Sequence, residues 1–217
     1  MITILKYAGC LLAAYLIGSF NTAYFLGKHK KVDIREGGSK NLGASNAMVI
    51  MGWKAGILVG AVDIFKCVLS VLLAALIFPY DPVFRFVAAA GCVLGHMFPF
   101  YLKFKGGKGF ACLVGAILGL DWRAFIVGGI LIIAITLLTD YIALATLTLS
   151  AAYPVFAYFY DMKRLPEGAK HTPWLFAAFA LVVSAIIFIK HIPNIKRMLN
   201  GTEIGLRGAS AGKYRKK

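Results

Sequence analysis

The segment AFIVGGILIIAITLLTDYIALATLTLSAAYPVFAYFY, residues 124–160, contains a single charged side chain, Asp140. The apolar runs on either side of it approach the ~20 residues with which an α-helix crosses the hydrocarbon core of a bilayer. Similar runs recur along the whole chain, at 3–26, 55–79, 82–102, 109–120, 124–139, 141–160 and 173–191. The pattern predicts an all-α integral membrane protein, a compact bundle of about seven transmembrane helices with short spans and glycine-rich cytoplasmic loops. The run 109–120 would be only about 18 Å long as a helix, so it either crosses as a short span or re-enters on the same side.

The composition supports this fold class. Of the 217 residues, 60% are hydrophobic, which exceeds what the core of a soluble protein requires. The formal net charge of +15 is concentrated between the apolar runs, as expected for loops beside anionic lipid headgroups. We expect membrane lipids and no nucleic acid as partners, because a soluble nucleic-acid binder would not expose such long apolar stretches. One membrane domain is predicted over residues 1–200, followed by a basic cytoplasmic tail over 201–217.

The distribution of basic residues predicts the orientation. Most lie in three connections, at 28–40, at 103–108 and from Lys190 to the end of the chain. Cytoplasmic loops carry an excess of Lys and Arg, so all three should be cytoplasmic. Seven spans would put them on one side, with the amino terminus outside. The loop 161–172 argues against this arrangement, because Lys163, Arg164 and Lys170 would then be external.

The four cysteines lie inside apolar runs without metal-ligand spacing, at Cys10, Cys67, Cys92 and Cys112. We interpret them as small core residues rather than disulfides or zinc ligands. The sequence shows no metal cluster, and we expect neither a metal requirement nor a cofactor.

Three segments carry polar side chains that could do chemistry. The first runs from Gly37 to Asn46, with the sequence GGSKNLGASN. Its glycines allow successive backbone N–H groups to converge on one anion, and Ser39, Asn41 and Asn46 add side-chain donors. A flexible connecting loop would have a similar composition.

The second segment is GHMFPF, residues 95–100, followed by FKGGKG, residues 104–109. Here His96, Lys105 and Lys108 frame glycines 106, 107 and 109. The spacing is not that of a Walker A loop. Glycines weaken the start of a helix, so their place beside cations suggests close approach of the backbone to a ligand. Positive-inside lysines and an interfacial histidine are the structural alternative.

The third segment, HIPNIKR, covers residues 191–197 and is followed by Gly201, Thr202 and Glu203. His191 and Asn194 are three residues apart and could both face the mouth of the bundle. Within the second apolar run, Asp63 and Lys66 lie one helical turn apart at membrane depth. Isolated charges are costly there, so we expect the two side chains to pair and to face the interior.

Taken together, the three segments resemble the bacterial acyl-phosphate:glycerol-3-phosphate acyltransferases, small multi-span enzymes of phospholipid synthesis. The pattern Gly-Ser-x-Asn-x-Gly-Ala-Ser-Asn is met by residues 38–46, and Gly-His-x-Phe-Pro with Phe-Lys-Gly-Gly-Lys-Gly by 95–99 and 104–109. His191, Asn194 and the 201–203 region meet the third motif. Three departures mark a divergent branch: Val49 stands where the family usually has an arginine, Leu42 where proline is common, and Cys67 where glycine follows the helix lysine. Lys40 or Lys54 could supply the charge missing at Val49.

The resemblance implies transfer of a fatty acyl group from acyl phosphate to the 1-hydroxyl of sn-glycerol 3-phosphate, in the inner membrane of a bacterium. Ser39, Asn41, Asn46, Gly37 and Gly38 would then cradle one phosphate, and Lys105 and Lys108, with Gly106, Gly107 and Gly109, would hold the leaving phosphate. His96 would position or polarise the reacting groups, and His191 and Asn194 would hold the glycerol phosphate. The alternative class is a membrane transporter of a phosphorylated metabolite, which would use similar basic loops.

Overall fold

The computed structural model describes residues 2–161 and 173–210, and every regular element in these ranges is helical. The long helices are α1 (Ile2–Ser19), α4 (Trp53–Ile77), α5 (Val83–Met97), α7 (Trp122–Thr139), α8 (Ile142–Phe156) and α9 (Pro173–Leu199). Shorter ones are α2 (Thr22–His29), α3 (Ala44–Met51), α6 (Phe110–Leu120), α10 (Leu206–Ser210), the 3-10 turn η1 (Phe100–Leu102) and the π-helical turn η2 (Ala157–Asp161).

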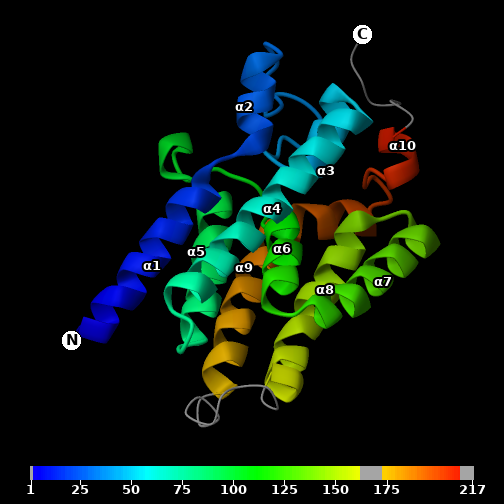
Figure 1. Ribbon diagram of the computed structural model, residues 1–217. Coiled ribbons are helices and arrows are strands. Elements are labelled where there is room, and N and C mark those ends of the chain that lie inside the picture. Colours follow the sequence, from blue (N-terminus) through cyan, green and yellow to red (C-terminus); the bar gives the residue numbers. More distant parts are fainter. Residues whose placement is uncertain (1, 162–172, 211–217) are drawn as a thin grey trace.

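The prediction of a multi-span helical membrane protein is confirmed. Six helices of the described residues are long and apolar enough to cross a bilayer, and Phe110–Leu120 is a seventh, shorter apolar helix. In Figure 1, α6 begins near the upper end of the bundle, where α5 ends, and runs downward before α7 turns back up. The chain therefore changes direction as seven spans require, although α6 is too short to reach across the hydrocarbon core. Residues 162–172, with Lys163, Arg164 and Lys170, lie outside the described residues.

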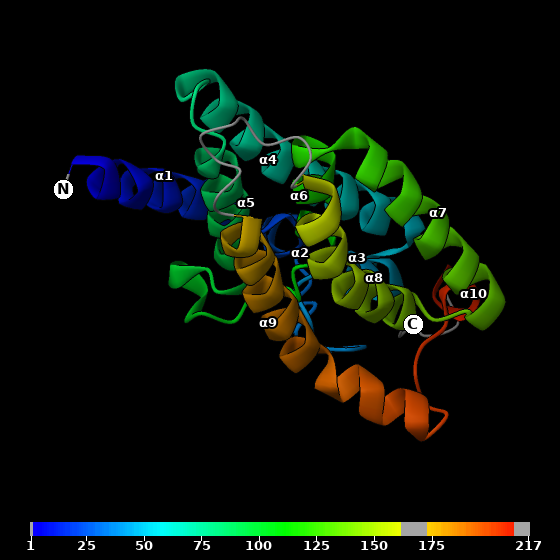
Figure 2. The same ribbon diagram turned by 90° about the horizontal axis from the view of Figure 1, so that it is seen from below.

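The short helix α6 lies inside the bundle. Seen along the bundle, it is surrounded by the other helices, with α1 and α7 at opposite edges (Figure 2). Its closest neighbour is α4: a Cβ atom at Gly115 would lie 2.3 Å from the carbonyl oxygen of Ile64. Close backbone approach through small residues is a usual basis of helix packing in membranes.

Helices α1 and α5 approach each other in the same way. A Cβ atom at Gly95 would lie 2.1 Å from the carbonyl oxygen of Tyr15, and one at Gly18 would lie 2.0 Å from that of Cys92. Substitution at either glycine would therefore push the two helices apart. Because Gly95 immediately precedes His96 in α5, this tight contact fixes the position of that buried histidine along the bundle.

The prediction that the cysteines are small core residues agrees with the burial of three of the four. Cys67, Cys92 and Cys112 are buried and Cys10 is half-buried, and all four are free thiols. The first three belong to the largest hydrophobic core cluster, which α4, α5, α6, α7, α8 and α9 share.

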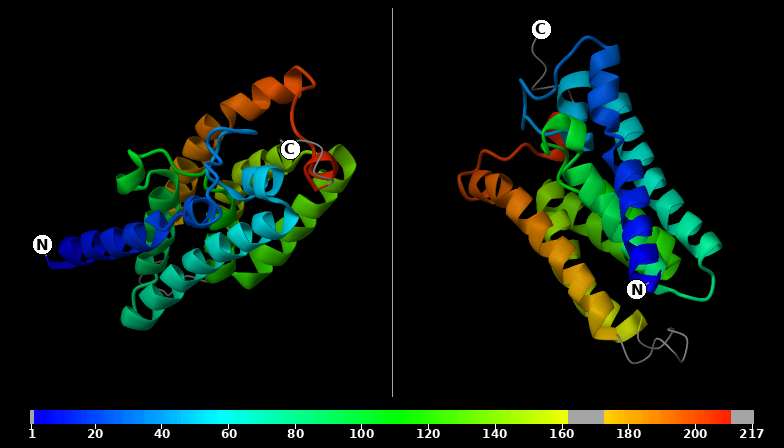
Figure 3. Two further views of the ribbon diagram at one scale, coloured as in Figure 1. Left: turned by 90° about the horizontal axis from the view of Figure 1, so that it is seen from above. Right: turned by 90° about the vertical axis from the view of Figure 1, so that its left-hand side faces the viewer.

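The three polar segments lie at one end of the bundle. The connection from α2 to α3, the η1 region and the carboxyl-terminal end of α9 with α10 all gather at the end opposite Ile2 (Figures 1 and 3). The division between residues 1–200 and the tail 201–217 stays a prediction. The described part of that tail, up to Ser210, packs against α3 and the turn between α7 and α8.

Candidate active site

A pocket opens where the three segments meet, with an empty volume of about 910 Å³ that includes its mouth. Residues from all three segments line it. Of the predicted site residues, the lining includes Ser39, Asn41, His96, Lys108, Gly109, His191 and Asn194. The other predicted residues are not part of the lining: Gly37, Gly38, Asn46, Lys105, Gly106 and Gly107.

Asn46 stabilises the loop of the first segment through hydrogen bonds to its backbone. Its side-chain oxygen accepts a hydrogen bond from the backbone N–H of Ser39 at 2.8 Å, and its amide group donates to the carbonyls of Ile34 at 2.7 Å and Gly37 at 3.3 Å. Gly38 has φ +57°, and a Cβ atom there would lie 2.2 Å from the Asn46 oxygen. Asn46 and the two glycines therefore shape a tight loop, which leaves Ser39 and Asn41 facing the pocket.

Gly106 and Gly107 pack against the end of α5. Their backbone N–H groups donate to the carbonyls of Met97 at 3.2 Å and His96 at 3.1 Å. A Cβ atom at Gly107 would lie 2.0 Å from Nε2 of His96. These glycines let the loop fold over the histidine, and they place Lys108 in the pocket while Lys105 stays exposed.

A polar chain joins the second and third segments. Lys108 donates to the side-chain oxygen of Asn194, and the Asn194 amide donates to Glu203. Arg197 donates through Nε to the other oxygen of Glu203 at 2.7 Å. Burial, followed by the charge of Arg197, lowers the pKa of Lys108 to about 8, while the Glu203 carboxylate opposes this shift. Lys108 and Arg197 thus face the single carboxylate of Glu203, and Asp63, which also lines the pocket, is paired with Lys66. The excess of positive charge favours an anionic ligand.

His191 lies beside this chain, on α9, and its side chain is buried. Its Nδ1 is 2.8 Å from the carbonyl oxygen of Ile187, one turn earlier in the same helix. A carbonyl oxygen only accepts hydrogen bonds, so Nδ1 carries a proton. The neutral ring therefore keeps an unprotonated Nε2.

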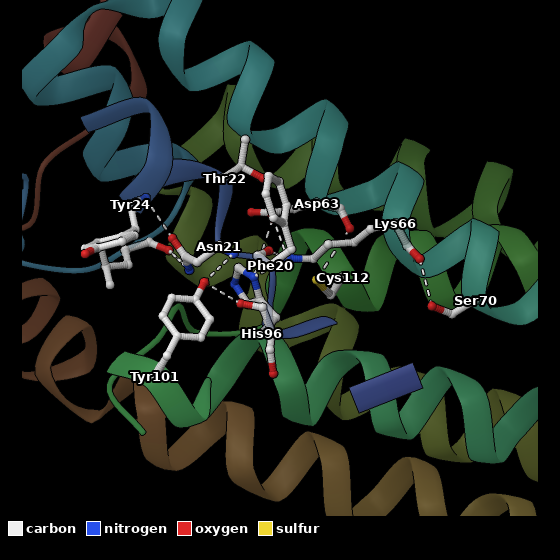
Figure 4. Close-up of polar contacts among 12 residues, drawn as sticks. Phe20, Asn21, Thr22, Tyr24, Asp63, Lys66, Ser70, His96, Tyr101 and Cys112 are labelled. Carbon is white, nitrogen blue, oxygen red and sulfur yellow. Dashed lines mark hydrogen bonds and ion pairs between the residues drawn. The ribbon is translucent and has the colours of Figure 1, made fainter. Parts of the chain in front are cut away.

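The Asp63–Lys66 pair forms as predicted, with 2.8 Å between Nζ and Oδ1 (Figure 4). Asp63 itself lines the pocket, next to His96. Lys66 Nζ also lies 3.1 Å from His96 Nδ1 and donates to the Phe20 carbonyl at 2.7 Å. Local spacing could identify the pair, but its contact with His96 joins two helices and has no signal in the sequence.

Asp63, His96 and Cys112 offer ligand atoms within 4.8 Å of one another. Each is already engaged, however. The Lys66 ammonium group contacts both Asp63 and His96, and the Cys112 thiol donates to the Asp63 backbone carbonyl at 3.4 Å. The ligand atoms of Asp63 and His96 are therefore better matched to the Lys66 ammonium group than to a metal ion.

Sequence reasoning left Arg197 and Glu203 out of the site residues, although both line the pocket. Val49 also lies in the lining and is buried. Lys40 and Lys54, proposed as sources of the charge missing at Val49, are exposed and outside the lining. The Lys54 ammonium instead lies 5.7 Å from the centre of the Trp53 ring. Arg197 is the additional cation that the pocket contains.

Comparisons with known proteins agree with this geometry. The family description "Glycerol-3-phosphate acyltransferase" matches residues 8–201. The chain is 32% identical to glycerol-3-phosphate acyltransferase 1 of Oceanobacillus iheyensis over 92% of this chain and 95% of that protein. It is 36% identical to glycerol-3-phosphate acyltransferase 2 of Moorella thermoacetica over 89% of this chain and 94% of that protein.

Two crystal structures of PlsY (YgiH), an integral membrane glycerol 3-phosphate acyltransferase, superimpose on the chain. The glycerol 3-phosphate form has a TM-score of 0.82 at 30% identity and covers 95% of this chain and 98% of that one. The lysophosphatidic acid form has a TM-score of 0.78 at 30% identity and covers 92% and 95%. The chain therefore belongs to the membrane-integral glycerol-3-phosphate acyltransferase family.

Proposed function

We propose that this chain transfers a fatty acyl group from acyl phosphate to the 1-hydroxyl of sn-glycerol 3-phosphate, giving lysophosphatidic acid and inorganic phosphate. The observation that carries the proposal is the pocket in which three distant segments bring Lys108, Arg197 and two histidines together at one end of a membrane bundle. The relatives' names supply the acceptor, and the solved relatives are glycerol 3-phosphate and lysophosphatidic acid forms. The transporter alternative gains no support from relatives that are named as acyltransferases.

The reaction needs positioning and neutralisation of charge more than a protein nucleophile. The 1-oxygen bonds to the acyl carbon, the bond from that carbon to the phosphate oxygen breaks, and the hydroxyl proton ends on the released phosphate. An acyl phosphate already has a good leaving group, so two anions held side by side in the correct geometry supply much of the rate.

The proposed roles follow from what each side chain faces. Ser39 and Asn41 would bind one phosphate, and Lys108 with Gly109 would neutralise the leaving phosphate. His191 and Asn194 would hold the glycerol phosphate, and His96 would polarise a reacting group. For the remaining predicted residues we propose indirect parts: Asn46, Gly37 and Gly38 form the loop, Gly106 and Gly107 seat His96, and Lys105 attracts anions from the surface.

The acyl chain would lie in an apolar groove between α5, α6, α8 and α9. Val93 and Leu113 line this groove, one turn or less from the pocket residues His96 and Phe110 along their helices, and Ala116 and Leu120 lie deeper. Ala116→Leu should shorten the groove, lowering turnover of long-chain donors while leaving short-chain donors unaffected. Equal losses with both chain lengths would argue against this groove.

The decisive experiment uses purified full-length protein in lipid nanodiscs with glycerol 3-phosphate and either acyl phosphate or acyl-CoA. Phosphate release and lysophosphatidate are followed together. Turnover with acyl phosphate supports the proposal, and turnover with acyl-CoA alone overturns the assigned donor. Flux of a phosphorylated solute without covalent change would favour the transporter.

We propose further that the protein lies in a bacterial inner membrane with its pocket on the cytoplasmic side. Basic side chains are frequent at the pocket end of the bundle, and cytoplasmic surfaces carry such an excess. Fusion of a fluorescent protein to the carboxyl terminus should give fluorescence, and fusion of a periplasmic phosphatase there should give no activity. The reverse pattern would contradict this orientation.

A further inference from the structure

Lys66 makes three polar contacts at the buried centre of the bundle, and its side chain is only 6% exposed. Its ammonium nitrogen lies 2.7 Å from the Phe20 carbonyl oxygen, 2.8 Å from Asp63 Oδ1 and 3.1 Å from His96 Nδ1 (Figure 4). An ammonium group carries three N–H donors and no lone pair. The three contacts therefore use all three donors, and His96 Nδ1 accepts the third.

The Asp63 carboxylate does not compete for a proton on that nitrogen. Its Oδ1 lies 3.5 Å from His96 Nδ1, beyond the roughly 2.7–3.2 Å of an ordinary N–H···O bond. The same oxygen already accepts from Lys66 and, at 3.2 Å, from the hydroxyl of Thr22. Because Nδ1 accepts a hydrogen bond from the Lys66 ammonium group, the single proton of the imidazole lies on Nε2.

His96 is one of the residues that line the pocket. Its Nε2 packs against the backbone of Gly107, a position where any side chain would cover this nitrogen. We propose that Lys66 is a positioning residue that fixes the tautomer of His96, so that His96 presents an N–H donor to the acyl phosphate rather than a free basic nitrogen. This inference deepens the proposed acyl transfer and rests on it for the identity of the ligand.

The consequence for the reaction is that His96 cannot take the hydroxyl proton. Its Nε2–H instead donates to the carbonyl oxygen or a phosphate oxygen of the donor, where negative charge develops as the 1-oxygen attacks the acyl carbon. The proton of the 1-hydroxyl passes to the departing phosphate, which leaves as hydrogen phosphate. Atoms and charges balance without any additional reactant.

His191 provides an internal reference, because its Nδ1 donates to the Ile187 carbonyl and its tautomer is therefore the opposite one. Nitrogen-15 NMR distinguishes protonated from unprotonated ring nitrogens. The chain has four histidines, so ¹⁵N-histidine labelling gives a small set of signals, assigned by single substitutions. In substrate-free full-length protein in nanodiscs, we expect His96 to be protonated at Nε2 and His191 at Nδ1.

Two substitutions then test the part played by Lys66. In Lys66→Met the donor to Nδ1 is gone, so the His96 proton should move to Nδ1, toward Asp63. The kcat should then fall by up to about a hundredfold to a thousandfold, the effect of losing one hydrogen-bond donor at a reacting oxygen, with a smaller change in KM for glycerol 3-phosphate. Lys66→Arg keeps a charged donor and should retain the wild-type tautomer and restore part of kcat.

Lys190→Met is the matched control. Lys190 also donates to a backbone carbonyl, that of Met97 at 3.0 Å, but the contacts described for it include no histidine ring. The Lys190→Met substitution should leave the protonation of the two His96 ring nitrogens unchanged. An intact His191 pattern in each variant shows that the pocket has folded. If Lys66→Met loses the His191 pattern, its pocket has not folded. The wild-type protein and Lys66→Arg then still show which ring nitrogen of His96 carries the proton.

A wild-type His96 protonated at Nδ1, or a pattern unchanged in a folded Lys66→Met protein, would overturn the inference. The NMR measurement needs no substrate, so it stands even if the chain uses another acyl donor. Conversely, acyl transfer from acyl phosphate by an enzyme with the opposite His96 tautomer would remove the inference and leave the proposed function intact.

Discussion

Lys108 is the residue whose charge state the pocket controls most directly. Burial and the neighbouring Arg197 lower its pKa to about 8, so the free protein carries an ammonium group there below that pH and a neutral amine above it. A neutral Lys108 would bind a phosphate dianion less well. We therefore expect kcat/KM for acyl phosphate to fall as the pH rises above about 8, because this parameter reports ionisations of the free enzyme.

Lys108→Arg provides the control for this pH dependence. The guanidinium group stays charged throughout the accessible range, so the alkaline fall should move to higher pH even though the different shape of arginine lowers the maximal rate. Steady-state rates between pH 6 and about 10 would show the difference. An unchanged alkaline limb in Lys108→Arg would assign the fall to another group. Lys108→Ala should lose tenfold or more below about pH 8, where the wild-type lysine is charged, and should lack the alkaline fall.

Asn46 and Asn41 allow a loop-forming role to be separated from a ligand-binding role. Asn46→Ala removes the hydrogen bonds to Ser39, Ile34 and Gly37, so it should destabilise the protein by about 1–3 kcal/mol and lower activity together with stability. Asn41→Ala should raise KM for a phosphate substrate and leave the melting temperature unchanged. Thermal unfolding in detergent and steady-state kinetics test both. A fully stable, inactive Asn46→Ala protein would return Asn46 to the ligand-binding set.

At the scale of elements, the loop between η1 and α6 packs against the His96 ring. Gly107→Ala would bring a Cβ atom to 2.0 Å from His96 Nε2, so the ring or the loop must move. Because a displacement of about 1 Å at a reacting group can cost about a hundredfold in rate, we expect kcat to fall by at least tenfold. Measurement of kcat and of the His96 NMR signals would show whether the ring has moved.

Gly129→Ala is a suitable control for Gly107→Ala. A Cβ atom at Gly129, on α7, would have no neighbouring atom within 4 Å, so the same chemical change should have no effect on rate. A Gly107→Ala protein with wild-type kcat would mean that the loop yields without disturbing His96.

The elements themselves were largely predictable, but the roles of several residues were not. Long apolar runs identify the spanning helices because the bilayer requires each of them to satisfy its own backbone. Within the loops, an asparagine such as Asn46 looks the same in sequence whether its amide faces an anion or the backbone behind it. The link from Lys66 to His96 depends on how α4 and α5 cross, which local spacing does not encode. Glu203 lies in the region that we assigned to the third motif, but nothing in the local sequence shows that its carboxylate turns back onto Asn194 and Arg197.

At the scale of the whole molecule, residues 203–209 close one wall of the pocket. They are fastened to the turn between α7 and α8, where the backbone N–H groups of Leu206 and Arg207 donate to the Asp140 carbonyl at 2.9 Å and its carboxylate at 3.0 Å. Asp140 itself has φ +65°, a conformation that glycine adopts readily. The tail is thus held by a turn that lies some sixty residues earlier in the chain.

Asp140→Gly should loosen this attachment without straining the turn, because it removes only the carboxylate. We expect faster tryptic cleavage after Arg207 and a higher KM for glycerol 3-phosphate, with little change in the melting temperature of the bundle. Limited proteolysis followed by mass spectrometry measures the first effect and steady-state kinetics the second. Cleavage at the wild-type rate would show that the remaining contacts of the tail suffice.

The wall formed by residues 203–209 also has a consequence for biosynthesis. A chain that stops just after α9 contains all the long apolar helices described above, yet it lacks Glu203 and the neighbours that complete the cavity. A frameshift or premature stop near residue 200 would leave an inserted but idle protein in the membrane.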